Sequence, residues 1–204
     1  MIYWIMGRSA GSRSRRFVAK GGSLRTESID ASLLADPSLI IYEAMLELPG
    51  IYLVSNGAQT RALLEGLQAG ETFDSVLSKW EREPDAPNFT PRISAMLDLQ
   101  SRPAALVLSL LKASPFEPAL TDRTTFRPAL PWPGLGIGLT TYSGDGNPLP
   151  SFQGDPLLLP CEGSVQDVLG TYWGALNADN RISLAVKRIP VHGGPSEIFI
   201  RNRY

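Results

Sequence analysis

Short apolar segments separated by turn-forming residues run along this chain and limit the folds open to it. Residues 2–6 (IYWIM) and 51–56 (IYLVSN) are rich in aromatic and β-branched types, which favours strands. Residues 16–20 alternate polar and apolar types, and Gly21-Gly22 is a turn signal. We therefore predict that residues 2–20 form a hairpin with an arginine-rich connection. Many strands of this kind predict a fold built on sheets.

Helical periodicity is found in a few segments only. In residues 59–69, Leu63, Leu64 and Leu67 recur at helical spacing, and Gly70 provides a stop. Two more helices are predicted over residues 71–80 and 165–177. Further strands are expected at residues 92–99, 104–114, 136–143, 182–191 and 197–202. Residues 38–48 fit either a strand or a helix, and the Pro-rich residues 113–135 are predicted to be irregular.

The bulk composition fits one globular domain. A chain of 204 residues can bury a real core, and 43% hydrophobic with 19% charged residues is ordinary for a soluble protein. No apolar run approaches the ~20 residues of a membrane span. The opening MIYWIM is too short for a signal peptide and is followed at once by arginines. A cytoplasmic location is the default expectation.

Charge is unevenly distributed along the chain. The first 26 residues hold six basic residues and no acidic one, namely Arg8, Arg13, Arg15, Arg16, Lys20 and Arg25. They carry +6, and since the whole chain carries −1, the remainder carries −7. A local cationic patch on an acidic protein indicates a small anion more than a nucleic acid, which favours a broad basic face. A solvated basic edge is the alternative.

Four polar strings carry a family resemblance when they are taken together and in order. They are GRSAGSRSRRF at 7–17, SNGAQT at 55–60, PDAPNFTPRI at 84–93 and TYSGDGNPLPSFQGDP at 141–156. From about Tyr3 to Val186 the chain resembles the archaeal-type IMP cyclohydrolase family and its bacterial relatives. That family closes the pyrimidine ring of purine nucleotides.

The resemblance also implies a fold. It implies an α+β protein forming one domain over residues 1–204, a four-layer αββα sandwich like that of N-terminal nucleophile hydrolases. The first residues are Met1-Ile2, so the sequence offers no Ser, Thr or Cys nucleophile there. Relatives usually carry an earlier Gly- and Arg-containing strand before the position of Tyr3, and the chain is expected to lack it.

The arginine-rich segment is expected to hold the substrate phosphate. A nucleotide monophosphate carries about two negative charges near neutral pH, and guanidinium forks match its oxygens in pairs. The residues that match family positions or add hydroxyl donors are Arg8, Ser9, Ser12, Arg13, Arg15 and Arg25. Arg16 and Lys20 have no such match and are predicted to lie on the surface.

A second set of polar residues is expected to contact the rest of the substrate. The pair Asn56-Gly57 follows a predicted buried strand and is, from the residues alone, either a tight turn or part of a site. The whole string SNGAQT favours the site, because the amides of Asn56 and Gln59 can read a carboxamide or purine edge. Gly57, Gln59 and Thr90 are the predicted binding residues of this set.

Four residues are predicted to be catalytic: Tyr42, Asn56, Glu83 and Arg92. Tyr42 is either a core tyrosine or, as the resemblance implies, faces the reacting formyl group. Arg92 opens a buried-looking strand and needs an anionic partner, either Glu83, Asp85 or the substrate. Ring closure is intramolecular, so positioning and preorganised donors supply much of the catalysis. We therefore predict no metal and no cofactor.

Other catalytic classes find little support. The one histidine, His192 in HGGP, is predicted to be a turn residue, and Cys161 a packed or incidental thiol. Nucleophilic Ser/His/Asp or Cys/His catalysis is therefore not favoured. A single cysteine excludes an internal disulfide, and neither CxxC nor HxxxH spacing occurs for zinc.

Three functional hypotheses stay open. The leading one is an enzyme that converts 5-formamidoimidazole-4-carboxamide ribotide to IMP with loss of water. The second is a relative that cyclises another amide-bearing substrate in specialised metabolism. The third is a nucleotide-binding protein without turnover. The expected partner is a small-molecule nucleotide, with no nucleic acid and no membrane, and exposed strand edges favour self-association into a homo-oligomer.

Overall fold

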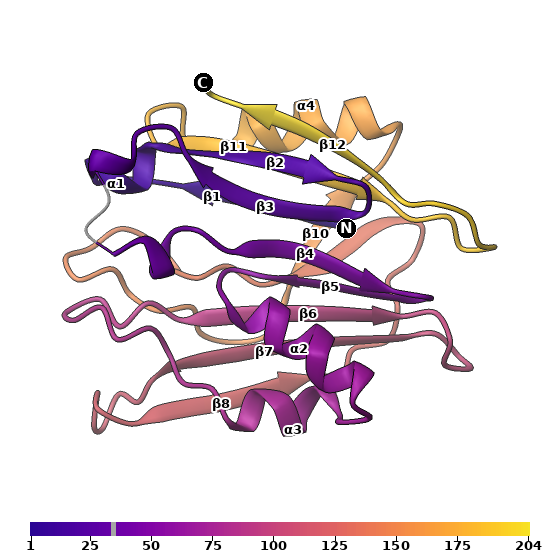
Figure 1. Ribbon diagram of the computed structural model, residues 1–204, viewed down its shortest axis with the longest axis horizontal. Coiled ribbons are helices and arrows are strands. Elements are labelled where there is room, and N and C mark those ends of the chain that lie inside the picture. Colours follow the sequence, from indigo (N-terminus) through magenta and orange to yellow (C-terminus); the bar gives the residue numbers. More distant parts are fainter. Residues whose placement is uncertain (34–35) are drawn as a thin grey trace.

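The computed structural model describes residues 1–33 and 36–204, which form a mixed α+β fold of antiparallel sheets (Figure 1). The largest sheet has seven strands that follow chain order. They are β2 (Arg15–Lys20), β3 (Ser23–Ser28), β4 (Glu43–Leu48), β5 (Ile51–Ser55), β6 (Arg92–Asp98), β7 (Ala105–Ala113) and β8 (Thr121–Phe126). Every neighbouring pair is antiparallel, so short turns connect most of the strands.

Two smaller sheets complete the strand content of the described residues. The three-stranded sheet has the order β1 (Ile2–Met6), β11 (Arg181–Arg188) and β12 (Glu197–Asn202). β9 (Gly134–Gly138) pairs with β10 (Leu157–Cys161) in a two-stranded sheet. The predicted hairpin of residues 2–20 is wrong, because β1 pairs with β11 and β2 pairs with β3.

The helices cover the sheets. α2 (Gln59–Gln68) contacts β4 and β5, α3 (Phe73–Ser78) packs beside α2, and α4 (Val165–Ala175) contacts β11 and β12 (Figure 1). α1 (Ala10–Arg13) and the 3-10 turns Ala31–Leu33 and Pro37–Leu39 are short connections. In the ranges that the structure describes, no helix is long and apolar enough to cross a membrane.

Strand β1 shows why two cores form on either side of the small sheet. Successive side chains of a strand point to opposite faces. Tyr3 and Ile5 are buried with residues of β2, β3 and β4, whereas Ile2 and Trp4 pack on the α4 side. A third cluster joins α2 and α3 to the large sheet through Leu46, Leu53, Leu63, Leu64, Phe73, Val76, Leu77 and Val107.

Some sequence predictions need correction. Residues 113–135 are not wholly irregular, because the Thr-rich β8 forms the edge of the large sheet beside β7. Its burial is partial, so it lacks the apolar pattern of an inner strand. Residues 38–48 are a 3-10 turn followed by a strand, β4. The strands β3 and β10 were not predicted, since β3 is largely polar and β10 contains Pro160.

Candidate active site

The antiparallel order of β4, β5 and β6 brings polar residues together at one end of these three strands. Tyr42 directly precedes β4, Asn56 and Gly57 follow β5, and Arg92 begins β6. Because β5 is antiparallel to both neighbours, its end lies beside the start of β4 and the start of β6, where Ser55 pairs with Ser94. Residues distant in sequence therefore meet there.

A buried cluster of Glu83, Arg92 and Gln59 lies at this end of the strands. Glu83 is 5% exposed, Arg92 9% and Gln59 0%. Nη1 of Arg92 donates to Oε1 of Gln59 at 3.1 Å and to Oε1 of Glu83 at 3.4 Å, and its Nε donates to the carbonyl of Glu81 at 3.0 Å. The guanidinium also lies 5.2 Å from the ring centroid of Trp80. Among the partners that the sequence left open for Arg92, the structure selects Glu83.

Burial makes the carboxyl of Glu83 a much weaker acid than an exposed glutamate. It raises the pKa of Glu83 to about 7, with the nearby Arg92 opposing and Asp85 adding to the increase. Burial likewise lowers the pKa of Arg92, which Glu83 opposes. A carboxyl with a pKa near 7 can both take and return a proton at neutral pH.

Gly57 allows the cluster to pack against the β5–α2 turn. A Cβ atom at this position would lie 2.4 Å from Nη1 of Arg92 and 2.6 Å from Oε1 of Gln59. Gly57 is buried, so a larger residue would displace these side chains. Gly57 therefore leaves room for the side chains of Arg92 and Gln59, whereas its role in substrate binding stays a prediction.

The amide of Asn56 is engaged by the backbone. Its Oδ1 accepts from the Ile93 N–H at 2.8 Å and from Nε2 of Gln59 at 3.2 Å, and its Nδ2 donates to the Pro91 carbonyl at 2.8 Å. These bonds fasten the end of β5 to the start of β6. Asn56 thus holds Gln59 and the strand end in place, beside the cluster.

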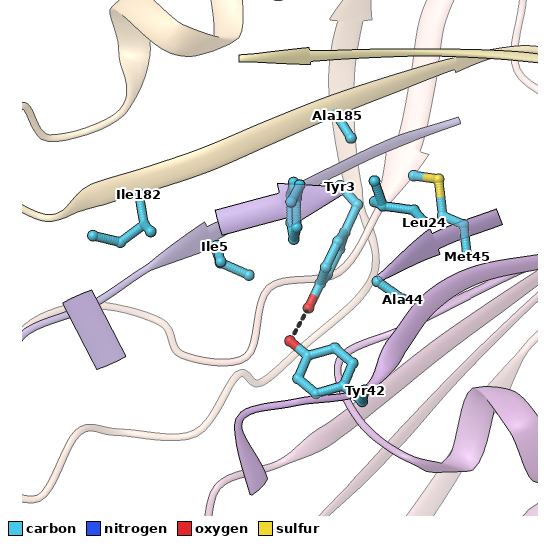
Figure 2. Close-up of a cluster of buried hydrophobic side chains, with 9 residues drawn as sticks. Tyr3, Ile5, Leu24, Tyr42, Ala44, Met45, Ile182 and Ala185 are labelled. Atoms are coloured by element: carbon cyan, nitrogen blue, oxygen red, sulfur yellow. Dashed lines mark hydrogen bonds between the residues drawn. The ribbon is translucent and has the colours of Figure 1, made fainter. Parts of the chain in front are cut away.

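The hydroxyls of Tyr3 and Tyr42 meet between the two larger sheets (Figure 2). They are 2.7 Å apart, and both side chains are buried. Burial raises the pKa of Tyr42, with the positive charge of Arg15 opposing. Burial also raises the pKa of Tyr3 well above its ordinary value. The negative charge of Glu83 acts on both phenols, so the dyad and the carboxyl share one electrostatic environment.

A second hydrogen-bonded group borders the same region. The Asp85 carboxylate accepts from the Thr90 N–H at 2.6 Å and from Oγ1 of Thr90 at 2.5 Å. The hydroxyl of Tyr142 lies 2.7 Å from the same Oγ1. Residues 141–152 are thereby connected to the loop before β6. Glu83 and Asp85 both act on the pKa of Tyr142, which burial raises.

Arg15 is the basic residue of the N-terminal segment whose positive charge opposes the increase that burial causes in the pKa values of Tyr3, Tyr42 and Glu83. Its Nε donates to the Ser12 carbonyl at 2.9 Å and its Nη2 to the Met6 carbonyl at 3.3 Å. These contacts hold the guanidinium in place and leave its charge uncompensated by any carboxylate in the described part of the chain.

Arg8 lies on the exposed side of the site. Its Nη2 forms an ion pair with the exposed carboxylate of Asp145, in the loop that follows Tyr142. Ser9 caps α1, accepting from the Ser12 N–H at 3.2 Å, and the Ser12 hydroxyl donates to the Ser9 carbonyl at 3.0 Å. These two serines therefore shape the segment that carries Arg8.

Two predicted binding residues point elsewhere. Arg13 donates to the Gly7 carbonyl at 3.1 Å and to Oδ1 of Asn180 at 3.2 Å, which joins the ends of β1 and β11. Arg25 lies on β3, largely exposed, and pairs with Glu27. His192 is an exposed turn residue, as predicted, and Cys161 is exposed on β10 rather than packed.

A surface hollow of about 540 Å³ lies at the other end of the same strands. Its lining includes Glu47, Gly50 and Tyr52 around the β4–β5 turn, with Pro190 and Gly194 beside it. It shares no residue with the polar cluster. We assign the site by its buried carboxyl, phenols and guanidiniums, because the one carboxylate that lines the hollow, Glu47, is 31% exposed and already paired with Lys187. In the described residues, no His, Cys, Asp or Glu side chains cluster in a way that could hold a metal ion.

Comparison with known families decides the relationship. Residues 1–192 match the model of the family described as IMP cyclohydrolase-like protein. The chain belongs to the IMP cyclohydrolase-like protein family. No curated protein matches the chain.

In this IMP cyclohydrolase-like protein, three polar residues of the site region were missed as site residues. They are Tyr3, Asp85 and Tyr142. A signal was present for Tyr142, the second residue of the family-like string at 141–156, and for Asp85, which stands in PDAPNFTPRI. Tyr3 carried none beyond its place in an apolar strand. Together with Glu83 and Tyr42 they supply acids, hydroxyls and guanidiniums suited to proton transfer and to stabilising developing negative charge.

Proposed function

We propose that the protein closes the pyrimidine ring of 5-formamidoimidazole-4-carboxamide ribotide, giving IMP and water. Family membership supplies the class of reaction. The observation that carries the proposal is the buried Glu83, with a pKa of about 7, beside Arg92 and the Tyr3–Tyr42 dyad. This set provides a proton acceptor and hydroxyl donors without a nucleophilic side chain.

The proposed steps balance in atoms and protons. The carboxamide nitrogen attacks the formyl carbon, and a new C–N bond forms as the carbonyl π bond moves onto oxygen. Glu83 takes the proton from the attacking nitrogen, and Tyr42 donates a hydrogen bond to the developing oxyanion. The former formyl oxygen takes up the proton that Glu83 holds and becomes a hydroxyl. The formamide nitrogen then loses its proton, its lone pair forms the C=N bond to the former formyl carbon, and the C–O bond breaks. The hydroxyl leaves with that second proton as water, so each of the two nitrogens supplies one proton and Glu83 returns to its starting state.

The arginine pair Arg8 and Arg15 is proposed to hold the phosphate. Arg15 is fixed by two carbonyls and is not paired with an acid. The ion pair of Arg8 with Asp145 is exposed, and exposed pairs are worth only about 0–1 kcal/mol. A dianionic phosphate competes well with such a partner, because charge-assisted bidentate bonds to phosphate are stronger.

The test is turnover by purified protein. We expect conversion of the formamido ribotide to IMP, followed by mass and absorbance, with a rate at least tenfold lower in Glu83→Gln. Glu81→Gln, two residues away and exposed, is the matched control and should behave as wild type.

Three outcomes separate the hypotheses. Conversion above background supports the proposal. Tight IMP binding without conversion would instead identify a nucleotide-binding protein. Absence of both would leave a relative that acts on another amide-bearing compound.

We further propose that the chain is one domain with four layers, as in N-terminal nucleophile hydrolases. The supporting observation is the order of the three cores: α2 and α3 on the large sheet, the large sheet on the small one, and the small sheet on α4. An experimental structure compared with such hydrolases tests this.

A further inference from the structure

We propose that Tyr142 determines substrate specificity by accepting, and not donating, a hydrogen bond. The site would then take a ring substituent that carries an N–H donor, such as a carboxamide, and reject a carboxylate in its place. The inference rests on the proposed function, since it names the chemistry recognised at that same site. Thr90 and Asp85 act as positioning residues.

The direction of the hydrogen bonds fixes what Tyr142 can offer. Oγ1 of Thr90 donates to Oδ2 of Asp85 at 2.5 Å, while the Thr90 N–H occupies Oδ1 at 2.6 Å. A threonine hydroxyl has one proton, so its oxygen can only accept from the Tyr142 hydroxyl at 2.7 Å. The phenol proton is therefore committed to Thr90. Only lone pairs of the Tyr142 oxygen remain for a ligand.

The backbone holds Tyr142 against reorientation. It pairs with Ser151 in an antiparallel bridge. On either side of it, the Ser143 N–H donates to the Pro150 carbonyl at 3.0 Å and the Phe152 N–H to the Thr141 carbonyl at 3.1 Å. Phe152 is 3% exposed, which anchors the loop.

Tyr142 also lies close to Glu83, because the Glu83 N–H donates to the Thr90 carbonyl at 2.9 Å and the Thr90 hydroxyl contacts the phenol. Burial raises the pKa of its phenol, so it keeps its proton near neutral pH. The charges of Asp85 and Glu83 add to that increase, whereas the hydrogen bond with Thr90 and the charge of Arg8 oppose it. A ligand carboxylate there would place acceptor oxygens against the lone pairs of the Tyr142 oxygen, and its negative charge would lie near Glu83 and Asp85. A carboxamide nitrogen would bring two N–H donors.

The test measures binding without turnover. The probes are 5-aminoimidazole-4-carboxamide ribotide and 5-aminoimidazole-4-carboxylate ribotide, which lack the formyl group and cannot cyclise. Calorimetric Kd values would be compared for wild type, Thr90→Val and Tyr142→Phe. Tyr172→Phe is the control, since Tyr172 donates to the Pro160 carbonyl far along the chain on α4.

We expect wild type to prefer the carboxamide by about tenfold or more, the effect of one hydrogen bond and an opposed charge. Thr90→Val keeps the phenol but frees its proton to donate, so carboxylate binding should improve relative to carboxamide by about tenfold. Tyr142→Phe should narrow the preference because it weakens binding of the carboxamide ribotide alone. Tyr172→Phe should leave it unchanged.

Failure of the inference and failure of the proposed function are distinguishable. If neither ribotide binds wild type, the proposed function fails, and the inference with it. If both ribotides bind but the ratio of their Kd values in Thr90→Val and in Tyr142→Phe is unchanged from wild type, the inference alone is overturned. An equal weakening of both ribotides in Thr90→Val, as a loosened loop would cause, also overturns it.

Discussion

At the scale of single residues, the hydroxyls of Tyr3 and Tyr42 depend on each other. Each phenol has one proton and they share one hydrogen bond, so one proton is left for a third group. If Tyr3 donates to Tyr42, the hydroxyl of Tyr42 can donate to the substrate oxygen. Tyr3 would then orient the donor without touching the substrate.

We predict that Tyr42→Phe lowers kcat by about 10- to 1,000-fold, as loss of other oxyanion donors does. It also leaves the buried hydroxyl of Tyr3 without its partner, which should lower the free energy of unfolding by about 1–3 kcal/mol. Tyr3→Phe breaks the same bond and should cost similar stability, yet it keeps the Tyr42 hydroxyl. Urea denaturation and steady-state kinetics of both variants make the check. An equal loss of kcat in the two would remove the distinct role of Tyr42.

Glu83 makes stability depend on pH. Burial raises its folded pKa from 4.5 to about 7, so the folded protein keeps a proton that the unfolded chain has lost. The contribution is fully present below pH 4.5 and is lost as pH rises to about 7, by about 3 kcal/mol in all. Glu83→Gln should remove this dependence, so its stability relative to wild type should be greater at pH 8 than at pH 5. If the difference in free energy of unfolding between Glu83→Gln and wild type, measured by urea denaturation, were the same at pH 5 and pH 8, the prediction would be contradicted.

At the scale of elements, the turn between β5 and α2 sets the position of the buried cluster. Asn56 fastens this turn to β6, and Gly57 lets Arg92 pass close to it. The helix that follows carries Gln59 in its first turn, which orients the guanidinium. One short connection thus joins the large sheet, α2 and the Arg92–Glu83 pair that holds the proposed base.

Gly57→Ala should destabilise the protein by about 1–3 kcal/mol, because its Cβ would overlap the side chains of Arg92 and Gln59. Displacement of Arg92 should also reduce kcat/KM. Gly170→Ala is the matched control, since its Cβ meets nothing within 4 Å inside α4, and it should gain up to ~1 kcal/mol. Thermal and urea unfolding compare the two, and equal stability would show that the turn has room for a methyl group.

The sequence predicts most elements but not how they pair. Strands such as β1, β5 and β7 are recognisable because apolar and β-branched residues are concentrated in them. The partner of β1 is β11, near the other end of the chain, and local periodicity contains no information about such a contact. Edge strands such as β8 bury too little to show a pattern.

The sequence also indicates part of the grouping of the predicted site residues, whose roles stay predictions. Tyr42, Asn56 and Arg92 lie at one end of the neighbouring strands β4, β5 and β6, and Glu83 joins them through its ion pair with Arg92. The roles of Asn56 and Arg13 follow instead from hydrogen bonds to backbone carbonyls and to distant residues. Tyr142 stands in the string at 141–156, but no motif shows that its hydroxyl contacts Thr90, 52 residues away.

At the scale of the whole molecule, Lys187 ties the sheets together. Its Nζ, on β11, donates to the Gly22 carbonyl in the β2–β3 turn at 2.7 Å and pairs with Oε2 of Glu47 on β4 at 2.5 Å. Glu47 also accepts from the Ser196 hydroxyl at 2.6 Å. Burial lowers the pKa of Lys187, and Glu47 opposes this. These contacts hold the three-stranded sheet in position on the seven-stranded sheet. The proposed site depends on that arrangement, since Tyr3 and Tyr42 come from different sheets.

We expect Lys187→Met to lower the free energy of unfolding by about 1–3 kcal/mol, because the Gly22 carbonyl loses its donor and Glu47, which is 31% exposed, loses its cation. Adding Glu47→Leu should recover part of that loss, since it removes the unpaired carboxylate. A double-mutant cycle by urea denaturation measures the coupling. Additive effects of the two substitutions would show that the pair contributes nothing to joining the sheets.

The guanidinium of Arg92 above Trp80 gives the molecule an optical reporter of its own. The emission of an indole responds to a charge beside its ring, and here that charge belongs to the residue that pairs with the proposed base. A ligand that shifts Arg92, or that changes the ionisation of Glu83, should therefore alter the fluorescence of Trp80. Occupancy of the site could then be followed in real time, without a dye and without waiting for product.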